Sequence, residues 1–318
     1  MVLVTTSVLP ASASAVQPRA SSDGTLPWSM NTSQNALGPT SAWTDMNTHI
    51  LNICNGKWCW QFNQTTNPLD GTNPNGWLND GNPIDISATL GNRLRASNGV
   101  LPWTNSGPTA GWEEYKNKYL SINVRSLMWL RSEQGAGSWA NSGNAYNLPE
   151  QDFWKDIVAA SDGTLIWSNR GITSAWTDKR NSREYFCNGK WCWVFNYDES
   201  RWQNQENVTN RGRAFDMTAL LKVAPAPNGT TLFTNGGPTV GWTDDVRNKS
   251  TVCNNGWCWS YIHQAGARPD MLDVSWERIN NQGLGQAFNP CVTWGGTNCP
   301  GTPPPAPRPG DFNGDNEV

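Results

Sequence analysis

The chain has 318 residues, of which only 15% are charged, and its formal net charge at pH 7 is −3. The absence of a basic cluster excludes nucleic acid as the expected partner, since that binding depends on neutralising phosphates, and no run approaches the roughly 18 apolar residues of a membrane span. The low charge and the abundance of small polar residues favour turns and strands over helices.

The first residues resemble the end of a secretory signal. Small and apolar residues lead to Ala13-Ser14-Ala15, which fits a signal-peptidase site, although a basic n-region is missing. A disordered N-terminal tail is the alternative. We interpret residues 1–20 as a signal-peptide remnant and expect a secreted or cell-surface protein.

One tryptophan pattern occurs four times in the body of the chain. It begins at Trp43, Trp112, Trp176 and Trp242. A second tryptophan follows each of these after seventeen residues, at Trp60, Trp129, Trp193 and Trp259. Self-similarity at a nearly fixed period indicates a copied supersecondary unit. We therefore divide residues 21–299 into four repeats of about 65 residues, at about 21–97, 98–160, 161–225 and 226–299.

Three pairs of cysteines share one spacing within these repeats. They are Cys54 with Cys59, Cys187 with Cys192, and Cys253 with Cys258. A two-residue turn inside each pair, of type II′ at Gly56 and Gly189 and of type I′ at Asn255-Gly256, makes the cysteines face each other on adjacent strands. The facing α-carbons would then be about 4.5–5.5 Å apart, within reach of a disulfide.

The second repeat supports this pairing, because Asn123 and Met128 replace both cysteines together. A zinc site is the weaker alternative, since the chain has only two histidines. We predict disulfides, with a fourth between Cys291 and Cys299, and hence an oxidising compartment.

Segments downstream of the hairpins alternate apolar and polar residues, for example at 84–90 and 215–223. This alternation predicts a further half-buried strand in each repeat, whereas residues 151–160 are irregular and could form a short helix. The fold class is therefore all-β, with disulfide-stapled hairpins. Four repeats of this size could form a small β-propeller, two paired β-sandwiches, or separate beads along the chain.

The C-terminus carries a proline-rich linker, residues 300–310, followed by Asp311, Asn313 and Asp315 at alternating positions. Such a pattern begins a calcium-binding loop, and in this context residues 311–318 resemble the first half-loop of a dockerin-type calcium repeat. The resemblance implies that Asp311, Asn313 and Asp315 are calcium ligands and that a cohesin-like or cell-surface anchor is a partner. Because the completing acidic residue is missing, calcium is expected only with the full loop, and the body needs no cofactor.

Most tryptophans in the repeated columns are expected to be core residues, because a buried indole dominates packing. Exposed tryptophans flanked by polar residues suit stacking on sugar rings. Trp77, Trp139 and Trp202 fall in irregular segments, where functional residues are common. The tryptophans beside the hairpin turns are further candidates for ligand contact: Trp58, Trp191 and Trp257.

An acidic residue follows the first tryptophan of every repeat, at Asp45, Glu114, Asp178 and Asp244. Fourfold repetition favours a turn-stabilising hydrogen bond over the single asymmetric carboxylate pair of a glycosidase. We identify no catalytic residue. The leading hypothesis is a secreted, non-catalytic module that binds glycan or another surface polymer; the alternatives are a carbohydrate-active enzyme, such as a glycoside hydrolase or lyase, and a self-assembling structural surface protein.

Overall fold

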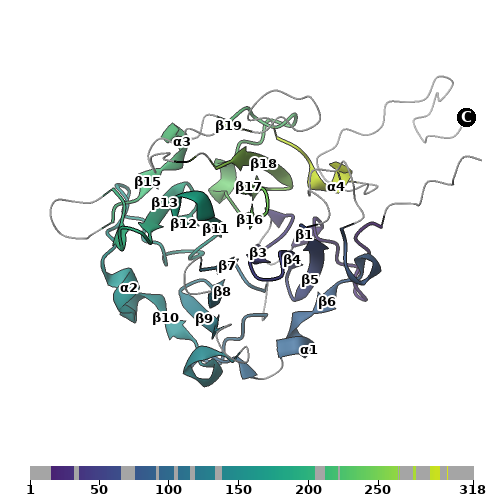
Figure 1. Cartoon of the computed structure of the whole chain (residues 1–318), viewed down its shortest axis with the longest axis horizontal. Helices are drawn as coiled ribbons and strands as arrows, with labels where there is room; N and C mark the ends of the chain where they lie inside the picture. The colour runs from purple at the N-terminus through teal and green to yellow at the C-terminus, as the bar shows by residue number, and fades with distance from the viewer. Residues whose placement is uncertain are drawn as a thin grey trace, which may run out of the picture.

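A computed structural model describes most of the body of the chain. The described residues are 16–31, 36–65, 76–90, 93–103, 107–114, 119–132, 138–204, 212–220, 223–263, 265, 275–276, 287–293 and 299. The signal-like start, the linker and the dockerin-like tail lie outside these ranges. Within them the chain forms four small antiparallel sheets around one axis, so the propeller is the correct one of the three predicted arrangements (Figure 1).

Each sheet is one blade, with its first strand nearest the axis. Blade 1 consists of β3 (Ser41–Asp45), β4 (Ile50–Asn55), β5 (Trp58–Asn63) and β6 (Ile84–Asp85). Blade 2 consists of β7 (Ala110–Glu113), β8 (Tyr119–Val124), β9 (Leu127–Ser132) and β10 (Tyr146–Asn147). Blade 3 consists of β11 (Ser174–Asp178), β12 (Arg183–Asn188), β13 (Trp191–Asn196), β14 (Arg201–Trp202) and β15 (Phe215–Asp216). Blade 4 consists of β16 (Val240–Asp244), β17 (Lys249–Asn254), β18 (Trp257–Ile262) and β19 (Ser275–Trp276). A small ladder, β1 (Met30–Asn31) with β2 (Ala36–Leu37), precedes blade 1.

The helical elements are short, and those that are α-helices lie at the periphery of the ring (Figure 1). They are α1 (Ile86–Leu90), α2 (Asp152–Lys155), α3 (Met217–Leu220), α4 (Pro290–Thr293), and the 3₁₀ turns η1 (Asn79–Gly81), η3 (Ala140–Gly143), η4 (Leu148–Glu150), η5 (Lys179–Asn181) and η6 (Thr234–Gly236). The short helix expected within residues 151–160 is α2.

Of the strands predicted at 84–90 and 215–223, only the first two residues are strand, β6 and β15, and α1 and α3 follow them directly. Residues 221–222 lie outside the described ranges. An aspartate at each boundary explains the change. The Asp85 carboxylate accepts hydrogen bonds from the Ser87 and Ala88 N–H groups, and that of Asp216 accepts one from Thr218 N–H. Such side-chain acceptors stabilise a helix start in place of a strand ladder.

The hairpins have the predicted turns and disulfides. Gly56 and Gly189 have φ of +63° and +59° at the first turn position, and Asn255 and Gly256 both have positive φ, as types II′ and I′ require. Disulfides join Cys54–Cys59, Cys187–Cys192, Cys253–Cys258 and Cys291–Cys299. In the three hairpins the facing α-carbons are 4.0 Å apart, closer than expected. In blade 2 the register pairs Asn123 with Met128 at the same place.

The inner tryptophan column (Trp43, Trp112, Trp176 and Trp242) joins each blade to the next. A β-carbon added to Gly111 of blade 2 would lie 2.6 Å from Trp43 of blade 1, and one added to Gly241 of blade 4 would lie 2.9 Å from Trp176 of blade 3. The same position holds Ala42 in blade 1 and Ala175 in blade 3. All four inner indoles are buried. A small residue therefore precedes each inner tryptophan because the indole of the neighbouring blade packs against it.

Hydrogen bonds also link the inner strands directly around the axis. The Thr44 hydroxyl donates to the Thr243 carbonyl, Thr243 donates to the Thr177 carbonyl at 2.6 Å, and Thr177 donates to the Glu113 carbonyl at 3.1 Å. Glu113 stands where the other inner strands have threonine, and its carboxylate accepts Met46 N–H of blade 1 at 2.5 Å. These bonds connect all four blades in sequence.

The outer tryptophan column (Trp60, Trp129, Trp193 and Trp259) is buried at 0–1% exposure, as predicted for core residues. Every indole N–H donates to a backbone carbonyl of the segment that precedes its own blade: Arg19, Arg95, Val158 and Ala224, at 2.8–3.1 Å. Satisfying the indole nitrogen removes the cost of burying it.

That preceding segment contains a five-residue rim turn before each blade. The four rim turns are 21–25, 96–100, 160–164 and 226–230, and in each the first N–H donates to the fifth carbonyl at 2.7–3.0 Å. The fourth residue is glycine with φ between +79° and +85°, a conformation that favours glycine. The rim turns face the hairpin turns of the blades.

Substituting Gly111 with alanine should destabilise the propeller by about 1–3 kcal/mol, because the new methyl group overlaps the Trp43 indole in a packed interface. Urea unfolding would measure the change, with Ala159→Val at an exposed position as a control expected within about 0.5 kcal/mol of the parent. A Gly111→Ala protein as stable as the parent would contradict the packing described.

Replacing Cys187 and Cys192 with serine should lower the free energy of unfolding by about 2 kcal/mol, the chain-entropy value for so short a loop. The fold should persist, because blade 2 has the same hairpin without a disulfide. Denaturant midpoint and near-ultraviolet circular dichroism of the double variant would check this, and loss of all tertiary signal would be the contrary result.

Candidate functional site

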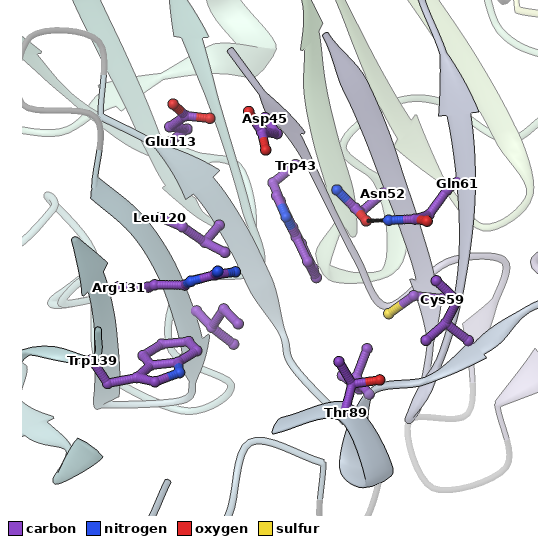
Figure 2. Close-up of a pocket in the computed structure, with 13 residues that line it drawn as sticks. Trp43, Asp45, Asn52, Cys59, Gln61, Thr89, Glu113, Leu120, Arg131 and Trp139 are labelled. Atoms are coloured by element: carbon purple, nitrogen blue, oxygen red, sulfur yellow. Dashed lines mark hydrogen bonds between the residues drawn. The ribbon is translucent and has the colours of Figure 1, made fainter. Parts of the chain in front are cut away.

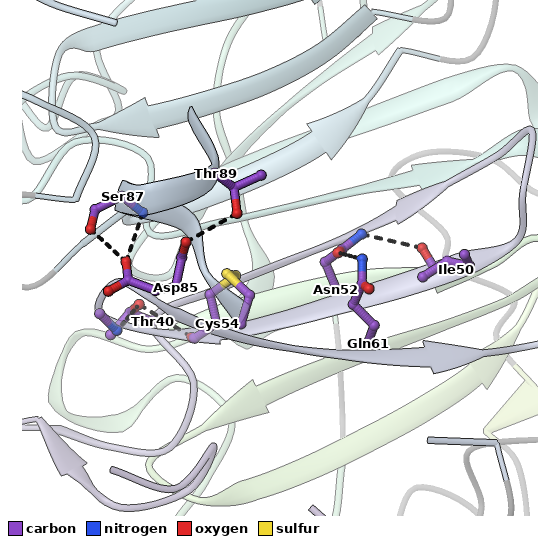
Figure 3. The surroundings of a disulfide bond; sticks show 10 residues. Thr40, Ile50, Asn52, Cys54, Gln61, Asp85, Ser87 and Thr89 are labelled. Carbon is purple, nitrogen blue, oxygen red and sulfur yellow. Dashed lines mark hydrogen bonds between the residues drawn. A yellow bond between two sulfur atoms is a disulfide. The ribbon is translucent and has the colours of Figure 1, made fainter. Parts of the chain in front are cut away.

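A cleft lies between blades 1 and 2 (Figure 2). Its volume is about 180 Å³. Blade 1 contributes Trp43, Asp45, Asn52 and Gln61, and blade 2 contributes Glu113, Leu120, Ile122, Arg131 and Trp139. Ile84, Ile86, Thr89 and Cys59 complete its lining. Figure 3 shows the Cys54–Cys59 disulfide with Thr89 of α1 nearby. We name this cavity the blade 1–2 cleft.

The cleft arises where aromatic packing is replaced by an arginine. In blade 1 Trp77 pairs with Phe62 of the third strand, and the ring centroids are 5.2 Å apart. In blade 3 Trp202 pairs in the same way with Phe195, at 5.3 Å. In blade 2 the same pairing joins Trp139 to Arg131. Without a phenyl ring beside it Trp139 stays half-buried, and the Arg131 side chain points toward Trp43 across the cleft.

The opposite wall of the cleft is made of two carboxamides. Asn52 and Gln61 are cross-strand partners, and the Gln61 amide donates to the Asn52 side-chain oxygen at 3.0 Å. The equivalent positions of blade 3 hold Tyr185 and Val194, which are buried in the interface with blade 4. Because a carboxamide carries two donors and two acceptor lone pairs, the Asn52–Gln61 pair retains capacity for hydroxyl groups in the cleft.

Two carboxylates also line the cleft, and both hold backbone turns. Asp45 accepts the Asn47 and Thr48 N–H groups at 2.9 and 3.0 Å, and Glu113 accepts Met46 N–H. Asp178 and Asp244 likewise accept the N–H of Asn181 and of Arg247. The prediction of a turn-stabilising role for the repeated acid is therefore confirmed for Asp45, Asp178 and Asp244.

The structure relocates several of the tryptophans proposed to contact ligand. Trp77 and Trp202 are 5% and 2% exposed, so they are core residues rather than exposed loop residues. The sequence did not reveal that they form one column with Trp139, because the chain between the outer tryptophan and this column varies in length among the repeats. Of the three, Trp139 alone lines the cleft.

Two of the three turn tryptophans, Trp58 and Trp191, fix their hairpins to the rim turns. The Trp58 and Trp191 indoles donate to Asp23 and Asp162 at 2.8 and 2.7 Å, and Trp191 and Trp257 are buried. The ammonium groups of Lys57 and Lys190 lie 4.7 and 4.6 Å from the ring centroids. Trp58 is half-buried. These contacts give Trp58 and Trp191 a structural role, and ligand contact by the three turn tryptophans stays a prediction.

A serine, a histidine and an aspartate meet between blades 3 and 4, a grouping the sequence did not suggest. His263 Nε2 lies 2.8 Å from Ser250 Oγ, and His263 Nδ1 lies 3.3 Å from Asp178 Oδ1. Ser250 and His263 are 0% and 1% exposed. A nucleophile must reach its substrate, so in this conformation the three residues form a buried polar contact between blades 3 and 4 rather than a hydrolytic site.

No group of three or more metal-ligating side chains occurs in the part of the chain that the structure describes. The predicted calcium ligands Asp311, Asn313 and Asp315 lie outside that part, so the resemblance to a dockerin repeat stays a prediction. Four disulfides indicate an extracellular, oxidising environment. Among the described helices, none is long and apolar enough to cross a membrane.

Comparison with known proteins supports the propeller class. No protein-family model matches the chain, and no curated protein sequence matches it. Among solved structures, a 2S albumin seed protein from Dolichos is 11% identical, with 80% of this chain and 96% of that chain covered and a TM-score of 0.53. A plant albumin from Cicer arietinum showing hemagglutination is 10% identical, with 80% and 95% covered and a TM-score of 0.51. These likenesses show the fold alone.

Burial holds the pKa of His263 below its usual value, while the charge of Asp178 opposes the shift and that of Arg180 adds to it. The unfolded chain therefore binds this proton more readily than the folded chain. Stability should be full above about pH 6.5, the usual histidine pKa, and should fall as the pH drops toward the lower folded value, by up to ~1.4 kcal/mol per pH unit.

Urea midpoints measured at pH 7.5, 6.5 and 5.5 would test this dependence. The His263→Gln variant should lose the slope, whereas Ala159→Val, an exposed substitution that changes no titratable group, should retain it. An unchanged slope in His263→Gln would assign the acid sensitivity to another group.

Proposed function

We propose that this protein is a secreted, non-catalytic propeller that binds a glycan in the blade 1–2 cleft. The observation that carries the proposal is the replacement of aromatic and aliphatic packing at one blade interface by Asn52, Gln61 and Arg131, next to the half-buried Trp139. An indole beside several hydrogen-bonding side chains complements a sugar ring, whose faces are apolar and whose edges carry hydroxyls.

The size of the cleft supports recognition of a short determinant. A volume of about 180 Å³ is below the ~300–1,000 Å³ of sites for drug-sized ligands, and is suited to one sugar unit of a larger polymer. In this proposal the dockerin-like tail anchors the module to a cohesin-like partner or to a cell surface.

A carbohydrate-active enzyme is the second candidate, because Asp45 and Glu113 line the same cleft. A glycosidase needs two carboxyl groups flanking the scissile bond. Both groups already accept backbone N–H hydrogen bonds that hold turns, which favours the binding function. Release of reducing sugar from a polysaccharide, abolished by Glu113→Gln, would support the enzyme instead.

A glycan array of the oxidised protein, followed by calorimetry on the best ligand, tests the binding proposal. Trp139→Ala should weaken affinity about tenfold or more, the loss typical of a central aromatic contact. Trp58→Ala is the matched control: it removes a half-buried tryptophan outside the cleft and should leave affinity unchanged. Absence of any array signal, or equal losses in both variants, would refute the proposal.

A further inference from the structure

Blade 2 departs from its sister blades at the contacts that fix a hairpin to its rim turn. In blades 1, 3 and 4 the residue before the hairpin turn is an asparagine: Asn55, Asn188 and Asn254. The side-chain amide of each donates to two backbone carbonyls just after the rim turn. Blade 2 has Val124 at that position. The turn tryptophan is replaced by Leu127, and the lysine before it by Ser126.

The partners of these side chains have changed as well. In blades 1 and 3 the rim-turn aspartate accepts the indole N–H, and a second aspartate, Asp85 or Asp216, pairs with the lysine at 2.7 or 2.9 Å. Blade 2 has asparagine in both places, Asn98 and Asn147. Blade 4 also has asparagine in both places, Asn228 and Asn289, and Gly256 in place of the lysine, yet it keeps Trp257. Blade 2 alone has lost both the turn tryptophan and the asparagine before the turn.

The exchanged residues surround a cavity of about 480 Å³ at the rim of blade 2, the rim cavity. Val100, Val124 and Leu127 give it apolar walls, and Asn98, Ser126 and Asn147 give it neutral polar groups. Arg125 and Glu150, both exposed, complete the lining. The volume lies within the range of small-ligand sites. The lining contains no aromatic ring, so the rim cavity differs in character from the blade 1–2 cleft.

The sister blades show which group this site is shaped to hold. In blades 1 and 3 an indole lies between the hairpin and the rim turn, and its N–H donates to the rim-turn carboxylate at 2.7–2.8 Å. In blade 2 the hairpin register and the rim-turn hydrogen bonds are the same, but the chain supplies only a leucine. Asn98 offers an amide oxygen, which also accepts Val100 N–H at 3.1 Å, where blades 1 and 3 offer a carboxylate. Blade 4 keeps Trp257 with an asparagine, Asn228, at the same rim-turn position.

We propose that the rim cavity of blade 2 binds the indole of a tryptophan side chain from a partner peptide, with the indole N–H directed to Asn98. The bound indole takes the place that the chain's own tryptophan has in blades 1 and 3. This site is separate from the proposed glycan site, and each can be tested without the other.

Binding of N-acetyltryptophanamide to the intact, oxidised protein, followed by calorimetry and by protein amide chemical shifts, is the test. The tryptophan probe should bind and perturb residues 96–100 and 124–127, whereas N-acetylleucinamide should bind at least tenfold more weakly. Leu127→Trp, which restores the sister-blade residue, should abolish binding. Equal affinity for both probes, or undiminished binding to a folded Leu127→Trp protein, would overturn the proposal.

A gain-of-affinity variant keeps the test decisive if Leu127→Trp does not fold. Asn98→Asp restores the acceptor used by Asp23 and Asp162, and should raise affinity for N-acetyltryptophanamide several-fold, since charge-assisted hydrogen bonds are stronger than neutral ones. The 1-methyl analogue, which lacks the indole N–H, should gain nothing from Asn98→Asp. An equal gain for both probes would place the indole nitrogen away from Asn98.

Discussion

The contact between an inner indole and the small residue of the next inner strand is the constraint on which the propeller depends. Gly111 and Gly241 leave no room for a β-carbon beneath Trp43 and Trp176. Repetition of one such contact from blade to blade sets how closely adjacent sheets approach, and closure follows when the last blade packs on the first. The threonine hydrogen bonds around the axis then fix the strands in register.

Both proposed binding sites arise where a repeated contact has been given up, and both involve blade 2. Arg131 replaces the phenyl ring that would cover Trp139, and Leu127 replaces an anchoring indole. Because the inner column and the outer column are unchanged in this blade, the ring is maintained while its rim and one interface vary. Blade 2 also lacks the hairpin disulfide, so its hairpin is held by pairing and packing alone.

Features set by local spacing were predictable from the sequence: the repeats, the turn types, the paired cysteines and the buried tryptophan columns. Features set by contacts between distant segments were not. The sequence did not distinguish a closed ring from paired sandwiches or separate beads, because the packing of Trp43 on Gly111 joins different repeats. The small residue before every inner tryptophan was the one sequence feature that indicated this packing. Trp77 and Trp202 were misplaced because loops of unequal length hide their column, and Asp178, Ser250 and His263 meet only after blades 3 and 4 associate.

Ring closure has a consequence for the order in which the chain can fold during its synthesis. The hydrogen bond from Thr44 to Thr243 joins residues 199 positions apart, and at about 5–20 residues per second the ribosome takes roughly 10–40 s to make that stretch. Throughout this interval the face of blade 1 that packs on blade 4, with Leu51 and Phe62, has no partner sheet. A nascent chain of this protein therefore exposes an apolar, strand-rich surface that a holding chaperone could cover until the fourth blade emerges.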